Sequence, residues 1–263
     1  MLRNQPFFLN GGEQACLLLH GLGSGVYEMQ LLGQYLHQQG LTVQAIHYPG
    51  HDQPVSKMPA STWPQWYGHV LETYQALAKD YTSVAVIGFS TGCLLSLHLA
   101  AAHPVEKLVL LCPYLALRRE WYYPLPVEAY LFSLGWLIQE VPRLRLPIQD
   151  PVMRAAAEKV EFFRTFNLAA VRSAIELIDR VKDEITRVSA PTLIIQARKD
   201  TIVDPAGAEW LRQNLTSSVE LSWLEHSDHI IPLDLERQQV FTQVGRFLRS
   251  PSSRLKAQRS LGD

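Results

Sequence analysis

The 263-residue sequence lacks long hydrophobic runs and paired cysteines. No apolar run approaches the ~20 residues that a transmembrane helix needs, and the N-terminal residues show no apolar stretch that ends in a small-residue cleavage site. We therefore expect a cytoplasmic protein with no stable membrane insertion. The three cysteines, Cys16, Cys93 and Cys112, each stand in an apolar run and form no Cys-x-x-Cys pair, which favours reduced core residues over disulfides.

The sequence also lacks an excess of charge of either sign, because its formal net charge is −1. A chain without a basic field has no general attraction for nucleic acid, so we expect no nucleic-acid partner. A hydrophobic content of 47% and a charged content of 19% exclude an intrinsically disordered chain. We find no internal repeat, and we expect residues 251–263 to form a flexible tail. The length fits one core with an insertion, and the oligomeric state stays open.

What is present is an alternation of short apolar runs with segments of helical spacing. The apolar runs lie at residues 15–20, 41–47, 83–89, 107–112, 192–197 and 219–224. Helical patterns cover residues 27–39, 62–79, 91–103 and 168–182, and a last one begins near Asp234, which we expect to cap it. This alternation predicts an α/β fold with a mainly parallel sheet and helices on both faces. Functional residues of such a sheet gather at the carboxyl ends of its strands.

Residues 115–167 interrupt this alternation. The segment holds nine of the 25 aromatic residues and is broken by several prolines. An aromatic insertion at the carboxyl end of a strand is typical of a cap over a pocket, and the alternative is a second small core that packs on the main one. We predict that residues 1–114 and 168–250 form the core, and that residues 115–167 form a small helical cap.

The pentapeptide GFSTG, residues 88–92, directly follows a buried run and opens a helical pattern. A serine hydroxyl is a poor nucleophile unless a base activates it and its oxyanion product is stabilised. A sharp turn from strand to helix would present Ser90, and the glycines on either side would permit so tight a bend. The helix would direct its N-terminal N–H groups at developing negative charge. Ser90 is therefore the candidate nucleophile, against the alternative of a Gly-rich turn that merely contains a serine.

The loop HGLGSG, residues 20–25, follows the first buried run. Such a loop can place a backbone N–H against the oxygen of a reacting carbonyl. We predict an oxyanion hole formed by the backbone N–H groups of Leu22 and Thr91, for which the side chains matter little. For His20 we favour a bracing role over catalysis.

Two further strand ends carry polar residues that suit a catalytic base and its partner. Asp200 follows the run 192–197, where a carboxylate can orient a histidine, while its neighbour Asp204 precedes a proline and suits a helix cap. The stretch WLEHSDHII, residues 223–231, holds two histidines three positions apart. Taken alone, it fits a zinc site, a catalytic base or a polar loop. We disfavour zinc because no partner residue has supporting spacing, although His226 and His229 could join Asp228, or His51 and Asp52.

Together these motifs resemble those of the α/β-hydrolases, and within them the small capped bacterial carboxylesterases and monoacylglycerol lipases. The resemblance covers nearly the whole chain and depends on HGLGSG at 20–25, YPGHD at 48–52, GFSTG at 88–92, QARKDTIVD at 196–204 and HSDHIIPLD at 226–234. It implies that Ser90 is the nucleophile, Asp200 the orienting acid and His229 the general base. The sequence departs from the family at Asp228, where glycine is usual. Its short N-terminal segment further implies that one or two opening strands are missing.

The resemblance implies a carboxylic ester hydrolase that works through an acyl-enzyme and needs no cofactor and no metal. The aromatic insertion favours a small-molecule ester substrate with an apolar acyl or alcohol part. A thioesterase or acyltransferase with the same three residues is one alternative. A ligand-binding protein without turnover is another, although the filled catalytic positions argue against it. We expect the remaining histidines on helix surfaces or in loops, with His51 as a candidate brace; they are His47, His51, His69, His98 and His103.

Overall fold

Seven strands of this computed structural model form one sheet in the order β1-β3-β2-β4-β5-β8-β9. The structure describes residues 1–118 and 138–251. The strands are β1 (Phe7–Leu9), β2 (Gln14–Leu19), β3 (Thr42–Ala45), β4 (Ser83–Phe89), β5 (Leu108–Leu111), β8 (Thr192–Ala197) and β9 (Val219–Leu224). Neighbouring strands pair in parallel, except that β1 runs antiparallel to β3. The predicted α/β fold with a mainly parallel sheet is confirmed.

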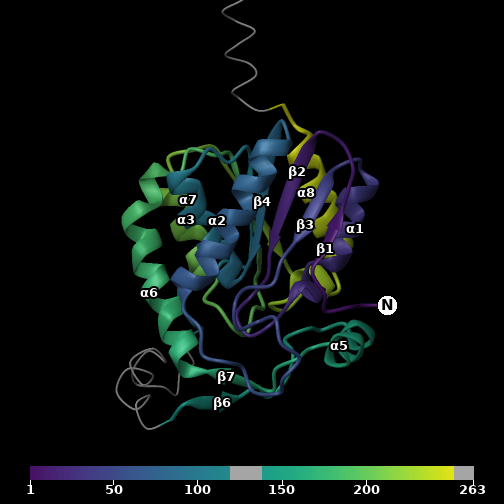
Figure 1. The fold of residues 1–263 in the computed structure, drawn as a ribbon, viewed down its shortest axis with the longest axis vertical. Coiled ribbons are helices and arrows are strands. Elements are labelled where there is room, and N and C mark those ends of the chain that lie inside the picture. Colours follow the sequence, from purple (N-terminus) through teal and green to yellow (C-terminus); the bar gives the residue numbers. More distant parts are fainter. Residues whose placement is uncertain (119–137, 252–263) are drawn as a thin grey trace, which may run out of the picture.

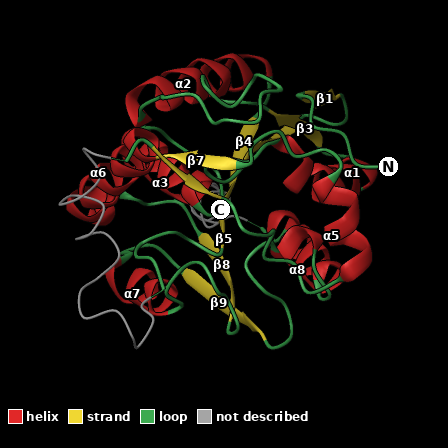
Figure 2. Cartoon of the chain, turned by 90° about the horizontal axis from the view of Figure 1, so that it is seen from below, coloured by secondary structure: helices red, strands yellow, loops and turns green. Residues whose placement is uncertain are grey.

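Helices cover both faces of this sheet (Figures 1 and 2). One face carries α1 (Gln30–Gln38) and α8 (Arg237–Arg249), and the other carries α2 (Trp63–Asp80), α3 (Thr91–Ala102), α6 (Leu168–Glu184) and α7 (Ala206–Asn214). Strands β2, β4, β5 and β8 are almost entirely buried, which explains why each is a continuous apolar run rather than an alternating one. None of the helices formed by the described residues has the length and apolar character needed to cross a bilayer.

All six predicted strands are present, and β1 is a strand that the sequence pattern did not indicate. Its three residues pair with β3 at the edge of the sheet, with Phe7 opposite Ala45. So short an edge strand gives no recognisable alternation in the sequence. Helix α2 begins with a capping box, in which the Gln65 side chain accepts a hydrogen bond from the Thr62 N–H at 2.9 Å.

The predicted cap of the last helix was wrong. Helix α8 begins at Arg237, after the short 3₁₀ turn η3 (Ile231–Leu233). Asp234 instead is fully buried and accepts hydrogen bonds from the backbone N–H groups of two loops, at Asp228 at 2.7 Å and at the distant Gln149 at 2.9 Å. A carboxylate so buried needs several donors, and Asp234 finds them in loops rather than in the first turn of a helix.

The described part of residues 115–167 lies beyond the carboxyl ends of the sheet strands (Figure 1). It contains the antiparallel ribbon β6 (Glu140–Pro142) and β7 (Thr165–Asn167), and the helix α5 (Pro151–Glu158). The aromatic ring of Phe166 packs on the loop after β2, because a Cβ on Gly23 would lie 2.8 Å from it. The predicted cap is therefore partly a β-ribbon; its residues 119–137, and residues 252–263 of the predicted tail, lie outside the described residues.

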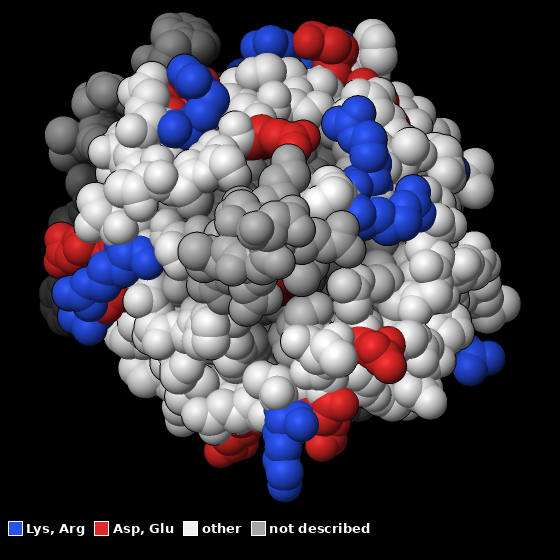
Figure 3. All heavy atoms as spheres, turned by 90° about the horizontal axis from the view of Figure 1, so that it is seen from above, with Lys and Arg blue, Asp and Glu red and all other residues white. Residues whose placement is uncertain are grey.

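The opposite end of the molecule, seen from above in Figure 3, carries acidic and basic side chains around its rim. Blue and red side chains are interspersed there, and among the described residues neither sign forms a broad patch on this face. This mixed surface agrees with the formal net charge of −1.

Candidate active site

Ser90 sits in a strained turn between β4 and α3. Its backbone has φ 54° and ψ −117°, which is unfavourable for a residue with a side chain. The turn is tight enough that a Cβ on Gly88 would lie 2.4 Å from the Gly92 carbonyl oxygen, and one on Gly92 would lie 2.3 Å from the Leu19 carbonyl oxygen. Glycine is therefore required at both positions, and the bend presents the Ser90 side chain at the end of the strand, as the sequence predicts.

The structure brings Ser90, His229 and Asp200 into one hydrogen-bonded chain. His229 Nε2 lies 3.0 Å from Ser90 Oγ, and His229 Nδ1 lies 2.7 Å from Asp200 Oδ2. The three side chains come from the loops after β4, β8 and β9, whose carboxyl ends lie at the same edge of the sheet. His226, the competing histidine, is exposed. Asp204, the competing carboxylate, accepts a hydrogen bond at 2.9 Å from the N–H of Ala206, the first residue of α7, although Pro205 and not Asp204 holds the cap position of this helix.

The environment of this pair favours an ionised Asp200 next to a basic His229. Burial raises the pKa of the Asp200 carboxyl, but His229 and the N–H groups of Ile202 and Val203 outweigh it, so that the pKa lies below its usual value. Burial lowers the pKa of the His229 imidazole, and carboxylates led by Asp200 outweigh it, so that this pKa lies above its usual value. The histidine is thus suited to accept a proton from Ser90.

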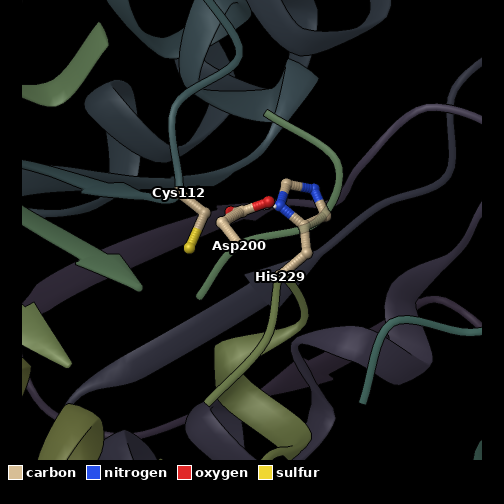
Figure 4. A group of neighbouring side chains, drawn as sticks. All are labelled: Cys112, Asp200 and His229. Carbon is tan, nitrogen blue, oxygen red and sulfur yellow. Dashed lines mark hydrogen bonds and ion pairs between the residues drawn. The ribbon is translucent and has the colours of Figure 1, made fainter. Parts of the chain in front are cut away.

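Cys112 lies next to the hydrogen-bonded group of Ser90, His229 and Asp200 (Figure 4). From the sequence we expected it only as a core residue. Figure 4 shows Asp200 between the Cys112 thiol and the His229 imidazole. These three residues are the group of potential metal ligands found among the described residues, and the group includes neither His226 nor His51. Burial and the Asp200 charge raise the pKa of the Cys112 thiol, so the thiol stays protonated beside the carboxylate.

The loop after β2 is held by buried side chains on both sides of Leu22. The Gly21 N–H donates to Glu28 Oε2 at 3.1 Å, and the Gly23 N–H donates to His51 Nε2 at 3.0 Å. His20 braces the loop, as predicted, because its Nδ1 donates to the Gly21 carbonyl oxygen at 2.8 Å. The first turn of α3 packs against this loop, since a Cβ on Gly92 would also lie 2.8 Å from the His20 carbonyl oxygen. The amides of Leu22 and Thr91 thus lie in neighbouring segments.

Three of the histidines that we expected on the surface of helices or in loops are buried. The exposed fractions of His47, His51 and His98 are 6%, 0% and 9%. His51 and His47 pack with His20 behind the loop after β2, and His98 lies 2.6 Å from the buried carboxylate of Glu184 on α6. Their partners are distant in sequence, so the local pattern carried no sign of burial.

Glu28 and Asp228 are further buried residues beside the site that the sequence analysis left without a place. Glu28 is 2% exposed and binds the loop after β2, and Asp228 is 1% exposed and points toward Thr201 rather than outward. A buried carboxylate needs hydrogen-bond donors, and the backbone N–H groups of loops supply them. An acidic residue close to a glycine-rich loop or to a candidate base is therefore the sequence signal that could have indicated Glu28 and Asp228.

Comparisons with known proteins agree with this fold and identify the family. The serine aminopeptidase S33 family matches residues 12–236. A carboxylesterase of Bacillus subtilis (strain 168) is 28% identical over 246 residues, which cover 93% of this chain and 96% of the relative. A thermostable monoacylglycerol lipase of Bacillus sp. (strain H-257) is 26% identical over 245 residues, which cover 92% of this chain and 93% of the relative.

The fold is shared with solved structures. One structure, described with the metagenome-derived lipolytic enzymes LipS and LipT, superposes with a TM-score of 0.82 at 22% identity and covers 94% of this chain and 98% of that one. The expected resemblance to carboxylesterases and monoacylglycerol lipases is thereby confirmed. Because the family match spans most of the sequence and the fold agrees with it, the chain belongs to the serine aminopeptidase S33 family of α/β-hydrolases.

Proposed function

We propose that this protein hydrolyses carboxylic esters, with Ser90 as nucleophile, His229 as general base and Asp200 as orienting acid. The observation that carries the proposal is the hydrogen-bonded chain from Ser90 Oγ through His229 to Asp200, with distances of 3.0 and 2.7 Å. A binding protein has no need of a strained serine turn joined to a buried, carboxylate-paired histidine. The names of the two bacterial relatives, a carboxylesterase and a monoacylglycerol lipase, support esters as the substrate class.

The reaction divides into acylation and deacylation. Ser90 Oγ attacks the ester carbonyl carbon while its proton passes to His229 Nε2, and the backbone N–H groups of Leu22 and Thr91 stabilise the resulting oxyanion. His229 then gives this proton to the leaving alcohol, so that an acyl-enzyme remains. Water attacks the acyl carbon, and its proton passes through His229 back to Ser90 as the acid is released. Asp200 stays ionised throughout and holds the imidazolium.

The substrate is proposed to be a small ester with an apolar acyl or alcohol part, under a cap formed by residues 115–167. Phe166 from this segment packs directly on the loop that carries Leu22, and the Met58 sulfur would lie 3.4 Å from a Cβ on Gly23. The Phe89 ring lies 5.0 Å from the His229 ring, measured between centroids. Apolar side chains thus border the loop that carries Leu22 and the His229 imidazole, which favours an apolar group of the substrate there.

A panel of substrates tests this proposal. Turnover of p-nitrophenyl esters and monoacylglycerols of graded acyl length is measured for the wild type and for Ser90→Ala, alongside thioesters and amino-acid p-nitroanilides. We expect ester hydrolysis to exceed anilide hydrolysis and to fall by a factor of ~10⁴ or more in the variant. A fluorophosphonate probe should label the wild type and not the variant.

Three outcomes would contradict the proposal. Unlabelled Ser90 in folded wild type would point to a protein without turnover. Faster cleavage of anilides than of esters would assign the site to peptide substrates, in line with the name of the family. Preferred transfer to an alcohol acceptor over water would make the protein an acyltransferase.

A further inference from the structure

Asp228, the residue directly before His229, joins the loops that carry Asp200 and His229. Its Oδ1 accepts hydrogen bonds from the Thr201 N–H at 2.9 Å, the Thr201 hydroxyl at 2.9 Å and the His229 N–H at 2.8 Å. Thr201 directly follows Asp200 in the chain. One carboxylate oxygen therefore binds the backbone N–H of the base and that of the residue directly after the acid.

These contacts close a ring around the His229–Asp200 hydrogen bond. On one side, His229 Nδ1 reaches Asp200 Oδ2 through side chains, at 2.7 Å. On the other side, the backbone N–H groups of Thr201 and His229 both donate to Asp228 Oδ1. The loops are 27 residues apart in sequence and follow the neighbouring strands β8 and β9, so this second link fixes their separation independently of the imidazole.

Asp228 is itself held firmly in place. Its side chain is 1% exposed, and its own N–H donates to Asp234 Oδ2 at 2.7 Å. The charged groups that act on the His229 imidazole are the carboxylates of Asp200, Glu28 and Asp228, and all three raise the pKa of that imidazole. In this buried site the Asp228 charge is weakly screened, so it stabilises the imidazolium form that arises when Ser90 gives up its proton.

On the basis of the proposed triad, we propose that Asp228 is a positioning residue that holds the acid and base loops in register and stabilises the His229 imidazolium. It does not touch the reacting atoms, because it acts on His229 through the backbone and through its charge. This gives a function to the carboxylate that stands where glycine was expected.

Two substitutions separate the geometric contribution from the electrostatic one. Asp228→Asn keeps an oxygen that can accept from Thr201 and His229 but removes the charge, whereas Asp228→Gly removes both. Glu225→Gln is the matched control, since Glu225 lies on the same loop, is exposed, and forms an ion pair with the exposed side chain of Arg198. For each protein, kcat and KM are measured against pH on a p-nitrophenyl ester, and thermal unfolding is followed by circular dichroism.

For Asp228→Gly we expect kcat to fall by about 100-fold with KM changed by less than about threefold, because a misplaced base affects the transition state more than substrate binding. For Asp228→Asn we expect kcat within about tenfold of the wild type. Loss of the negative charge lowers the pKa of His229, so the acid limb of the kcat/KM profile should move to lower pH by about half a unit or more. Glu225→Gln should match the wild type in all respects.

A readout independent of turnover tests the same point. The imidazole nitrogens of His229 are titrated by ¹⁵N NMR in the wild type and Asp228→Asn, with the resonances assigned through their absence in His229→Ala. A lower pKa in Asp228→Asn supports the proposal. Titration curves and acid limbs that superimpose would overturn it, as would kcat of folded Asp228→Gly within twofold of the wild type.

The remaining outcomes are also decisive. If Asp228→Gly does not fold, the comparison of wild type with Asp228→Asn still decides the electrostatic contribution. If the wild type cleaves no ester, the proposed function fails, whereas the NMR titration still supports or overturns the effect of Asp228 on His229.

Discussion

Buried histidines lie on both sides of Ser90, and the two sides place them in opposite environments. On the side of β8 and β9, carboxylates surround His229 and raise its pKa. On the side of β2, His20 packs against His47 and His51, with ring centroids 5.6 and 5.4 Å away. There burial and the neighbouring imidazoles lower the pKa of His20, and burial lowers that of His51 to about 3.

Burial alone therefore does not decide what a histidine can do. An imidazole that can share its charge with a buried carboxylate serves as a base, and one among rings and other imidazoles stays neutral. Neutral His51 can accept the Gly23 N–H through Nε2, which a protonated ring could not. We infer that the first group moves a proton and the second shapes the loop that carries Leu22.

The largest expected effect comes from replacing the base itself. His229→Ala should lower kcat for ester hydrolysis by a factor of ~10⁴ or more, because Ser90 then lacks a proton acceptor. His226→Ala, three residues away on the same loop but exposed, should retain kcat within about twofold. Steady-state kinetics on a p-nitrophenyl ester measures both. Equal losses in the two variants would show that the base is assigned to the wrong histidine.

Much of this candidate site could be predicted from the sequence. Ser90, Asp200 and His229 each follow an apolar run, and the parallel sheet brings the ends of such runs to one edge. Local patterns therefore singled out Ser90 and Asp200, whereas the choice of His229 over His226 came from the resemblance to the α/β-hydrolases. Their catalytic role stays a prediction until it is tested. Asp234 shows the limit of local patterns, because a helix cap and a receiver of distant backbone N–H groups look alike in sequence.

Bracing roles were predicted for His20 and His51 behind the loop after β2, but their burial and their distant partners could not be, for a related reason. His51 binds Gly23 across 28 residues of sequence, and Asp228 binds Thr201 across 27. Polar residues in turns are ordinarily solvated, and only the packed structure shows that these are buried and paired. The part of the site that sequence patterns miss is therefore the part that positions the reacting groups.

A change to the second group of histidines should have an intermediate effect. His51→Phe keeps a ring of similar shape against Trp66 and Phe163 but leaves the buried Gly23 N–H without its acceptor. We expect kcat to fall about tenfold, and the free energy of unfolding to fall by about 1–3 kcal/mol, the cost of an unpaired buried donor. Enzyme kinetics and urea titrations measure the two quantities.

The matched control for this change is His69→Phe, on the half-exposed surface of α2. It should leave both quantities nearly unchanged. An unaltered kcat in His51→Phe together with reduced stability would show that His51 supports the fold and not the loop that carries Leu22.

The smallest expected effect is a difference in how stability depends on pH. In the unfolded chain His51 titrates near its usual pKa of about 6.5, whereas in the folded protein its pKa is lowered to about 3. Between these values the unfolded state binds a proton at His51 that the folded state does not, so the contribution of His51 to the stability falls as the pH falls from about 6.5 toward 3. His20 and His47, whose pKa values are also lowered, act in the same direction. His229 acts in the opposite direction, because its raised pKa favours folding at low pH and this contribution is lost as the pH rises through that value.

The variant His51→Phe lacks one of these titrating groups. As the pH falls, its free energy of unfolding should therefore decline less steeply than that of the wild type, by at most about 1.4 kcal/mol per pH unit. Urea titrations of both proteins at pH 7.5, 6 and 5 give the two slopes, and parallel slopes would mean that His51 binds a proton in the folded protein and does not belong to the neutral group.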